Sequence, residues 1–201
     1  MTNQRPGEMA PAQTQDKIVH SALELFRERG YEATGIADIV ERAGVRSGSL
    51  YHFFESKEHV LAAVLEAYQE ALIPQVFDAP MRRESEPLAR IMAVLADYRE
   101  RLLTTDFRYR CPIGSLALEV GTVSERARAL IDANFAAWRT AIAGALSEAR
   151  LKRGTDVRTL ATFVLTVMEG GVMQAAAQRS PDPFDASVAH LRAYLTSLLE
   201  S

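Results

Sequence analysis

Side chains suited to nucleic acid gather in residues 46–57. The serines near the start of this stretch are small and polar, so a helix that carries them can approach base edges closely. The tyrosine and histidine that follow can reach phosphate oxygens, and the lysine stands at the expected start of another helix, whose positive end also favours a phosphate. Together with a threonine that opens the preceding helix, the residues predicted to contact DNA are Thr34, Arg46, Ser47, Ser49, Tyr51, His52 and Lys57.

The elements that must position these side chains are two short helices and a tight turn. The apolar pattern predicts one helix from 36 to 43, beginning at Thr34 as its cap, and a second from about 47 to 53. Gly44 supplies the left-handed residue between them. This arrangement is typical of a helix-turn-helix, which projects its second helix into a major groove. The alternative is a plain helical hairpin in a core.

Charge does not support this prediction by itself. The net charge of the chain is −3, and residues 1–60 hold seven basic and nine acidic side chains. Such a segment cannot bind DNA by bulk charge, so it needs cations and helix ends gathered on one face. We therefore expect a measurable but moderate salt dependence of binding.

From Asp16 to Leu65 the order of residues resembles the TetR family of transcriptional regulators. The matching pieces include Gly30-Tyr31, Ala43-Gly44-Val45, the run from Gly48 to Phe54, and Ser56-Lys57-Glu58. The resemblance implies a homodimeric DNA-binding regulator, usually a repressor released by a small molecule. One departure is Gly35, where the family commonly has Thr or Ser, so the prediction relies on Thr34 for that phosphate contact.

The rest of the chain also reads as helix. Strand alternation and hairpin turns are missing from the sequence, and caps and glycines separate about nine helices. Thr14, Ser56, Ser124, Thr155 and Asp182 are the expected caps. The prediction is an all-α protein with three parts: a flexible tail at 1–13, a three-helix DNA-binding domain at 14–57, and a helical ligand-sensing and dimerisation domain at 58–201.

Large apolar and aromatic side chains in the second domain recur at helical spacing. They are candidates for a ligand cavity, although such stripes are more often core. The candidates are Met92, Leu95, Tyr98, Cys111, Phe135, Trp138 and Met168.

Cys111 is the single cysteine and opens the segment Cys111–Glu119, which looks like one found in a branch of the family. Arg108, Arg110 and a following helix N-terminus would lower the pKa of its thiol, so Cys111 could sense electrophiles or oxidants. The alternative is a small apolar residue in a core.

Two helices at the end of the chain are the expected dimer interface. Small residues permit close helix approach and larger ones supply area; the candidates are Phe163, Val167, Gly170, Gly171, Leu191, Tyr194 and Leu198. Residues 159–178 carry one charge, Glu169, and a membrane span is the rejected alternative, because a mid-bilayer glutamate is costly.

The sequence offers little for catalysis or cofactors. Its four histidines are scattered, without metal-ligand spacing, and no phosphate-binding glycine loop appears. A single cysteine fits a reducing cytoplasm. We predict a cytoplasmic, non-enzymatic repressor without cofactor or membrane contact, which binds operator DNA as a homodimer and responds to an unknown small-molecule effector. The alternatives are a ligand- or electrophile-responsive helical protein and an activator that is not released by a small molecule.

Overall fold

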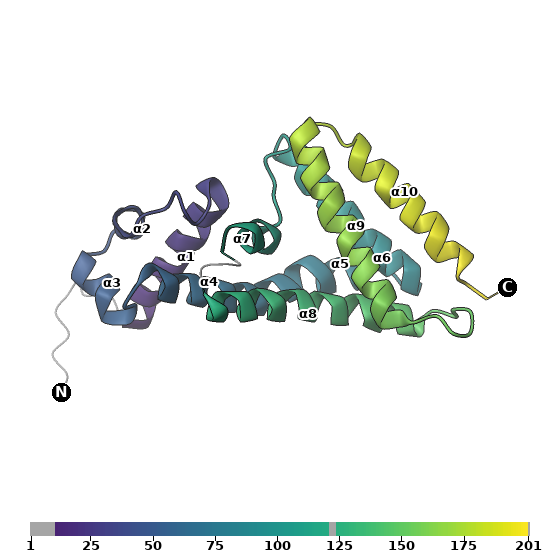
Figure 1. Cartoon of the computed structure of the whole chain (residues 1–201), viewed down its shortest axis with the longest axis horizontal. Coiled ribbons are helices and arrows are strands. Elements are labelled where there is room, and N and C mark those ends of the chain that lie inside the picture. The colour runs from purple at the N-terminus through teal and green to yellow at the C-terminus, as the bar shows by residue number, and fades with distance from the viewer. Residues whose placement is uncertain (1–10, 121–123, 201) are drawn as a thin grey trace. The chain divides into compact units, whose positions relative to one another are not determined.

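The computed structural model describes residues 11–120 and 124–200, and almost all of them are helical. The helices are α1 (Pro11–Arg29), α2 (Ile36–Ala43), α3 (Ser47–Phe53), α4 (Lys57–Leu72), α5 (Ala79–Met81), α6 (Pro87–Thr104), α7 (Pro112–Val120), α8 (Glu125–Glu148), α9 (Val157–Gln178) and α10 (Asp182–Ser197) (Figure 1). A π-helical stretch, η1 (Ile73–Asp78), makes α4, η1 and α5 one continuous helix. Counted so, these residues form nine helices and no strand, as expected.

The π-helical stretch has a local cause. Pro74 lies inside it and Pro80 follows in α5. Proline has no N–H to donate to the preceding turn, so the helix continues past these residues only with altered hydrogen bonding. The helix passes through Pro74 and ends at Met81, directly after Pro80.

The described residues divide into two compact units. Unit 1 comprises 11–67, 115–120 and 124–131, and unit 2 comprises 68–114 and 132–200. The expected DNA-binding helices all lie in unit 1. That unit also includes most of α4 and α7 and the start of α8.

Unit 1 is built on the packing of α1 against α2 and α3. Ile18, Ile39 and Leu50 are completely buried, one from each helix. Gly30 (φ +88°) ends α1 and Gly44 (φ +63°) ends α2. Both need the left-handed backbone that glycine adopts without cost, so each turn can reverse the chain sharply and set α3 across its neighbours.

The helix starts agree only in part with the expected caps. Ser56 accepts a hydrogen bond from the His59 N–H at 3.3 Å and Ser124 accepts one from the Ala127 N–H at 3.1 Å, as expected. Thr14 lies inside α1, and the cap of α9 is Asp156, whose carboxylate accepts hydrogen bonds from two backbone N–H groups. Thr155 instead donates to the Lys152 carbonyl. Asp182 is the first residue of α10 rather than its cap.

Unit 2 packs α6, α9, α10 and the larger part of α8. Trp138 is completely buried, with its ring centroid 5.4 Å from that of Phe77. Helices α9 and α10 form an antiparallel pair (Figure 1), and Gly171 leaves room for Phe184 of α10, because a Cβ there would lie 2.9 Å from the Phe184 ring. The end of α10 is tied to the α8–α9 loop by the Lys152 N–H, which donates to the Leu198 carbonyl at 2.8 Å.

Two helical stretches, Lys57–Met81 and Val157–Gln178, are long and apolar enough to cross a bilayer by length and composition alone. The core helix of a soluble protein passes the same test. In Val157–Gln178 the apolar residues Leu160, Val164, Met168 and Val172 are buried within unit 2. This packing accounts for the composition of α9 without a membrane.

Candidate nucleic-acid interface

Helix α3 presents the expected polar face to solvent. Leu50 is completely buried and anchors the helix, while Arg46, Ser47 and His52 are exposed and Ser49 is half-buried. Tyr51 is 56% exposed, which is unusual for so large an aromatic side chain. Four of the five predicted contact residues at positions 46–52 are therefore exposed, and their contact with DNA stays a prediction.

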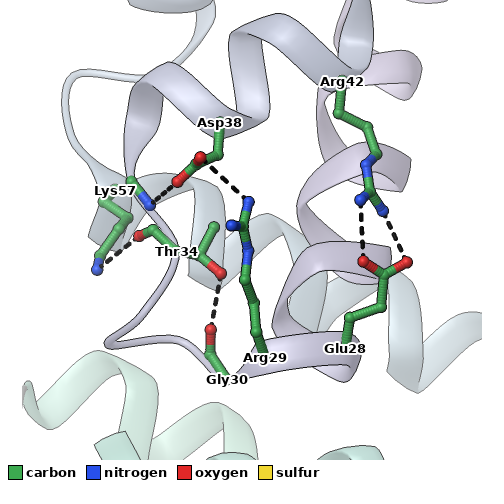
Figure 2. A network of polar contacts seen from close by, with 8 residues as sticks. Glu28, Arg29, Gly30, Thr34, Asp38, Arg42 and Lys57 are labelled. Carbon is green, nitrogen blue, oxygen red and sulfur yellow. Dashed lines mark hydrogen bonds and ion pairs between the residues drawn. The ribbon is translucent and has the colours of Figure 1, made fainter.

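Thr34 does not have the role expected of it. Its side chain is 1% exposed, and its hydroxyl donates to the Gly30 carbonyl at 2.7 Å. Gly35 rather than Thr34 caps α2, and the Asp38 carboxylate accepts the Gly35 N–H at 2.7 Å (Figure 2). The predicted cap at Thr34 is wrong, and its buried hydroxyl, which is already used to close the α1–α2 turn, does not favour the predicted phosphate contact.

Lys57 has a structural role in addition to the predicted one. Its ammonium donates to the Tyr31 carbonyl at 3.0 Å and to the Thr34 carbonyl at 3.1 Å, and it lies 4.0 Å from the centroid of the Tyr31 ring. An ammonium has three N–H donors, so one remains for a phosphate. Figure 2 shows this lysine reaching back to the turn that precedes α2.

Ion pairs fix α2 against α1. Arg42 forms a bidentate pair with Glu28 at 2.8 and 2.9 Å, and Arg29 contacts Asp38 at 3.1 Å (Figure 2). The hydrogen bonds from Arg42 hold the pKa of Glu28 below its usual range. These acids are thus neutralised inside unit 1. Arg46, by contrast, has no acidic partner among the described residues and is exposed, so its charge is available to DNA.

Two family models match separate stretches of this chain. The family of bacterial regulatory proteins called tetR matches residues 18–64, and the C-terminal domain of LmrA/YxaF-like transcriptional regulators matches residues 87–190. The second match alone covers more than half of the chain. The chain belongs to the TetR family.

Individual relatives agree with this assignment of a TetR-family regulator. The transcriptional regulator YxaF of Bacillus subtilis is 29% identical over 85% of this chain and 88% of its own length. The repressor DhaR of a Mycobacterium species is 25% identical over 88% of this chain and 89% of its own. A crystal structure of a regulatory protein TetR from Rhodobacter sphaeroides, 26% identical, superposes with a TM-score of 0.78 and covers 90% of this chain and 97% of its own. The chain is thus a helix-turn-helix transcriptional regulator and not an enzyme.

Within this TetR-family fold, the predicted ligand-contacting residues lie in unit 2. Leu95, Tyr98, Cys111, Trp138 and Met168 are buried there. Met92 and Phe135 are only half-buried. The buried polar atoms Tyr98 Oη and Trp138 Nε1 have no hydrogen-bond partner within the described part of the protein. An unpaired buried polar group is costly.

Two residues that the sequence prediction did not assign to this core stand beside Tyr98. Glu169 on α9 is the single charge noted in the apolar stretch, and its Oε1 is buried without a hydrogen-bond partner among the described residues. Tyr109 packs edge-on against Tyr98, with ring centroids 5.8 Å apart. Burial raises the pKa of both the Glu169 carboxyl and the Tyr109 phenol. The sequence signal for Glu169 was its position as the single charge in an apolar helix. No feature of the sequence pointed to Tyr109.

The structure reverses the predicted electrostatics of Cys111. The thiol is 3% exposed, and burial, followed by the nearby Glu169 carboxylate, raises its pKa well above the usual value. Arg108 and Arg110 are exposed instead of facing it. The sulfur accepts the Gly114 N–H at 3.3 Å and so helps to begin α7. These observations favour a core cysteine over a reactive one.

Alkylation of native protein tests this assignment. A raised pKa lowers the thiolate fraction at neutral pH, and burial blocks access, so Cys111 is expected to react with iodoacetamide more than about tenfold more slowly than an exposed thiol. Mass spectrometry over time at pH 7.5 measures the rate, with protein unfolded in guanidinium as the reactive control. Equal rates in the native and unfolded protein would contradict the assignment.

Six of the seven predicted dimer residues line an open groove on α9 and α10. The groove has a volume of about 510 Å³ and includes Phe163, Val167, Gly170 and Tyr194. Phe163 is 44% and Tyr194 48% exposed, and their rings contact edge to face. Gly171 and Leu191 also line the groove, but both are buried between the two helices of one protomer. Leu198 is half-buried at the end of α10.

Proposed function

We propose that this chain is a cytoplasmic repressor that binds a pseudo-palindromic operator as a homodimer and is released by a small-molecule effector. The observation that carries the DNA-binding part is the exposed face of α3, where Arg46 has no acidic partner and Tyr51 projects into solvent. Those side chains suit phosphate and base contact in a major groove. The relative DhaR is itself named a repressor, which supports the sign of regulation.

The dimer is supported by the surface of α9 and α10. Two large aromatic side chains are exposed beside small residues, on the pair of helices that ends the chain. Such a patch is characteristic of an interaction site rather than of a free surface. In a two-fold dimer the recognition helices would enter successive major grooves, about 34–36 Å apart.

The effector part is supported by the polar atoms buried in unit 2. Tyr98 Oη, Trp138 Nε1 and Glu169 Oε1 have no hydrogen-bond partner among the described residues. A small molecule that satisfied them would stabilise one arrangement of the helices. A difference of about 1–3 kcal/mol between its binding to the free and the DNA-bound protein would weaken operator binding roughly five- to 150-fold.

Selection of bound duplexes from a random DNA pool tests the proposal. We expect a motif with two related halves, bound by the dimer and released by a compound found in a subsequent screen. Trp138 is the only tryptophan, so its fluorescence reports directly on binding near it. Folded protein that enriches no duplex would contradict the DNA-binding part. Compounds that bind but leave operator affinity unchanged at fixed salt would contradict the release mechanism.

A further inference from the structure

The turn between α1 and α2 is held by a residue from a distant part of the sequence. Glu119, near the end of α7, accepts hydrogen bonds from the Tyr31 N–H at 2.7 Å and from the Glu32 N–H at 3.3 Å. All three residues lie in unit 1. A carboxylate that accepts two backbone N–H groups forms charge-assisted hydrogen bonds, which are stronger than those between neutral groups.

The absence of a side chain at Gly30 leaves space for the Glu119 carboxylate. A Cβ at position 30 would lie 2.7 and 2.8 Å from the two oxygens of Glu119, closer than real side-chain atoms approach. The backbone of Gly30 is also left-handed, with φ +88°. The glycine therefore serves the turn twice, by its conformation and by the space that its missing side chain leaves for Glu119.

The carbonyl groups of the same turn are also bound, by side chains from within unit 1. The Tyr31 and Thr34 carbonyls accept hydrogen bonds from Lys57, and the Gly30 carbonyl accepts one from Thr34 (Figure 2). Glu119 binds the N–H groups of the turn, whereas Lys57 binds its carbonyl groups. Helix α2 begins directly after this turn and packs on α3. A displacement of the turn would therefore move the helix pair that meets DNA.

We propose that Glu119 is a positioning residue for operator binding: it fixes residues 30–34 and, through them, α2 and α3. The inference rests on the proposed function. Glu119 would act through the turn and not on the DNA itself, because a carboxylate repels phosphate. Glu119 is the last residue of the segment Cys111–Glu119, and through it α7 contacts the turn that precedes α2.

Operator affinities of Glu119→Ala and Glu119→Gln, with Glu66→Gln as the matched control, test this role. Glu66 is a half-exposed acid of unit 1 that pairs with Arg126 and lies outside the turn. Each Gln variant removes one negative charge, which by itself favours DNA binding slightly. We expect Glu119→Ala to weaken operator binding about five- to twentyfold, and Glu119→Gln to weaken it less, because the amide oxygen still accepts one N–H. Glu66→Gln should not weaken it.

Hydrogen exchange supplies a second measurement that does not depend on DNA. The amides of Tyr31 and Glu32 are expected to exchange faster in Glu119→Ala, while the buried amides of α1 and α4 keep their protection. Operator affinity equal to that of Glu66→Gln, or unchanged exchange at Tyr31 and Glu32, would overturn the proposal. If Glu119→Ala fails to fold, Glu119→Gln decides by the same two measurements. A wild-type protein that binds no duplex would contradict the proposed function, and exchange would still show whether Glu119 holds the turn.

Discussion

Phe163→Glu is expected to convert the protein to a monomer and to weaken binding to a two-half operator by roughly 100-fold or more. Phe163 lies in the groove on α9 and α10, is 44% exposed, and contacts Tyr194 edge to face. In a two-fold interface each such residue occurs twice, so the substitution would bury two carboxylates in one apolar seam. In a dimer, binding of one protomer to its half-site raises the effective concentration of the other protomer at the second half-site. A monomer lacks this gain in affinity.

The substitution should leave the single protomer folded. Because Phe163 is 44% exposed in the protomer, its replacement removes less buried apolar area there than a core substitution would. Sedimentation velocity measures the oligomeric state, fluorescence anisotropy at fixed salt measures operator affinity, and circular dichroism checks the helix content. Leu103→Glu is the matched control, since Leu103 is 39% exposed on α6 and does not line the groove. A Phe163→Glu protein that remains dimeric would rule out this groove as the centre of the interface.

The sequence predicted the helix-turn-helix well because local patterns determine it. Leu50 is the aliphatic residue among mostly polar neighbours in the short predicted helix. The helix face that carries Leu50 is therefore expected to be buried and the opposite face exposed. Gly44 marks a left-handed turn that few other residues tolerate. These two features fix where α2 ends, how α3 begins and which side chains of α3 face solvent, and the structure agrees on all three.

The two errors at the site have different causes, one local and one from a distant part of the sequence. Thr34 follows the rule for a cap, but its hydroxyl finds the Gly30 carbonyl and becomes buried. The two basic neighbours of Cys111 suggested an acidic thiol, whereas Glu169 from α9 and burial have the opposite effect on its pKa. The Thr34 outcome depends on how the α1–α2 turn closes, whereas the Cys111 outcome cannot be derived from spacing, because tertiary packing decides which distant residue the thiol meets.

Glu119 illustrates the same limit from the other direction. Nothing in its local sequence distinguishes an acid near the end of a short apolar helix from a solvated one. Only the folded arrangement of unit 1 brings its carboxylate to the N–H groups of Tyr31 and Glu32. By contrast, the glycine that makes room for it, Gly30, was visible in the sequence as the end of α1.

Arg46→Ala is expected to weaken binding to the selected operator by about 1–3 kcal/mol per half-site, which is roughly five- to 150-fold for each, and to lower the magnitude of the salt slope by about two, because the homodimer carries two copies of Arg46. Arg46 is exposed at the start of α3 and lacks an acidic partner among the described residues, so its charge is not already neutralised by the protein. Because unit 1 has no excess of basic residues, the removal of one such cation should matter more than it would in a strongly basic domain.

The matched control for this substitution is Arg27→Ala. Arg27 is an exposed residue of α1, outside the recognition helix, and its replacement changes the net charge by the same amount. The Arg46 side chain makes no capping hydrogen bond to α3, so alanine removes a contact to DNA without removing a cap. Binding isotherms for the operator and a scrambled duplex at four salt concentrations separate two cases. A loss confined to the operator indicates contact with a base, and an equal loss on both duplexes indicates contact with a phosphate. If Arg46→Ala and Arg27→Ala shift affinity and slope alike, α3 does not carry the contact, and another face of unit 1 binds the DNA.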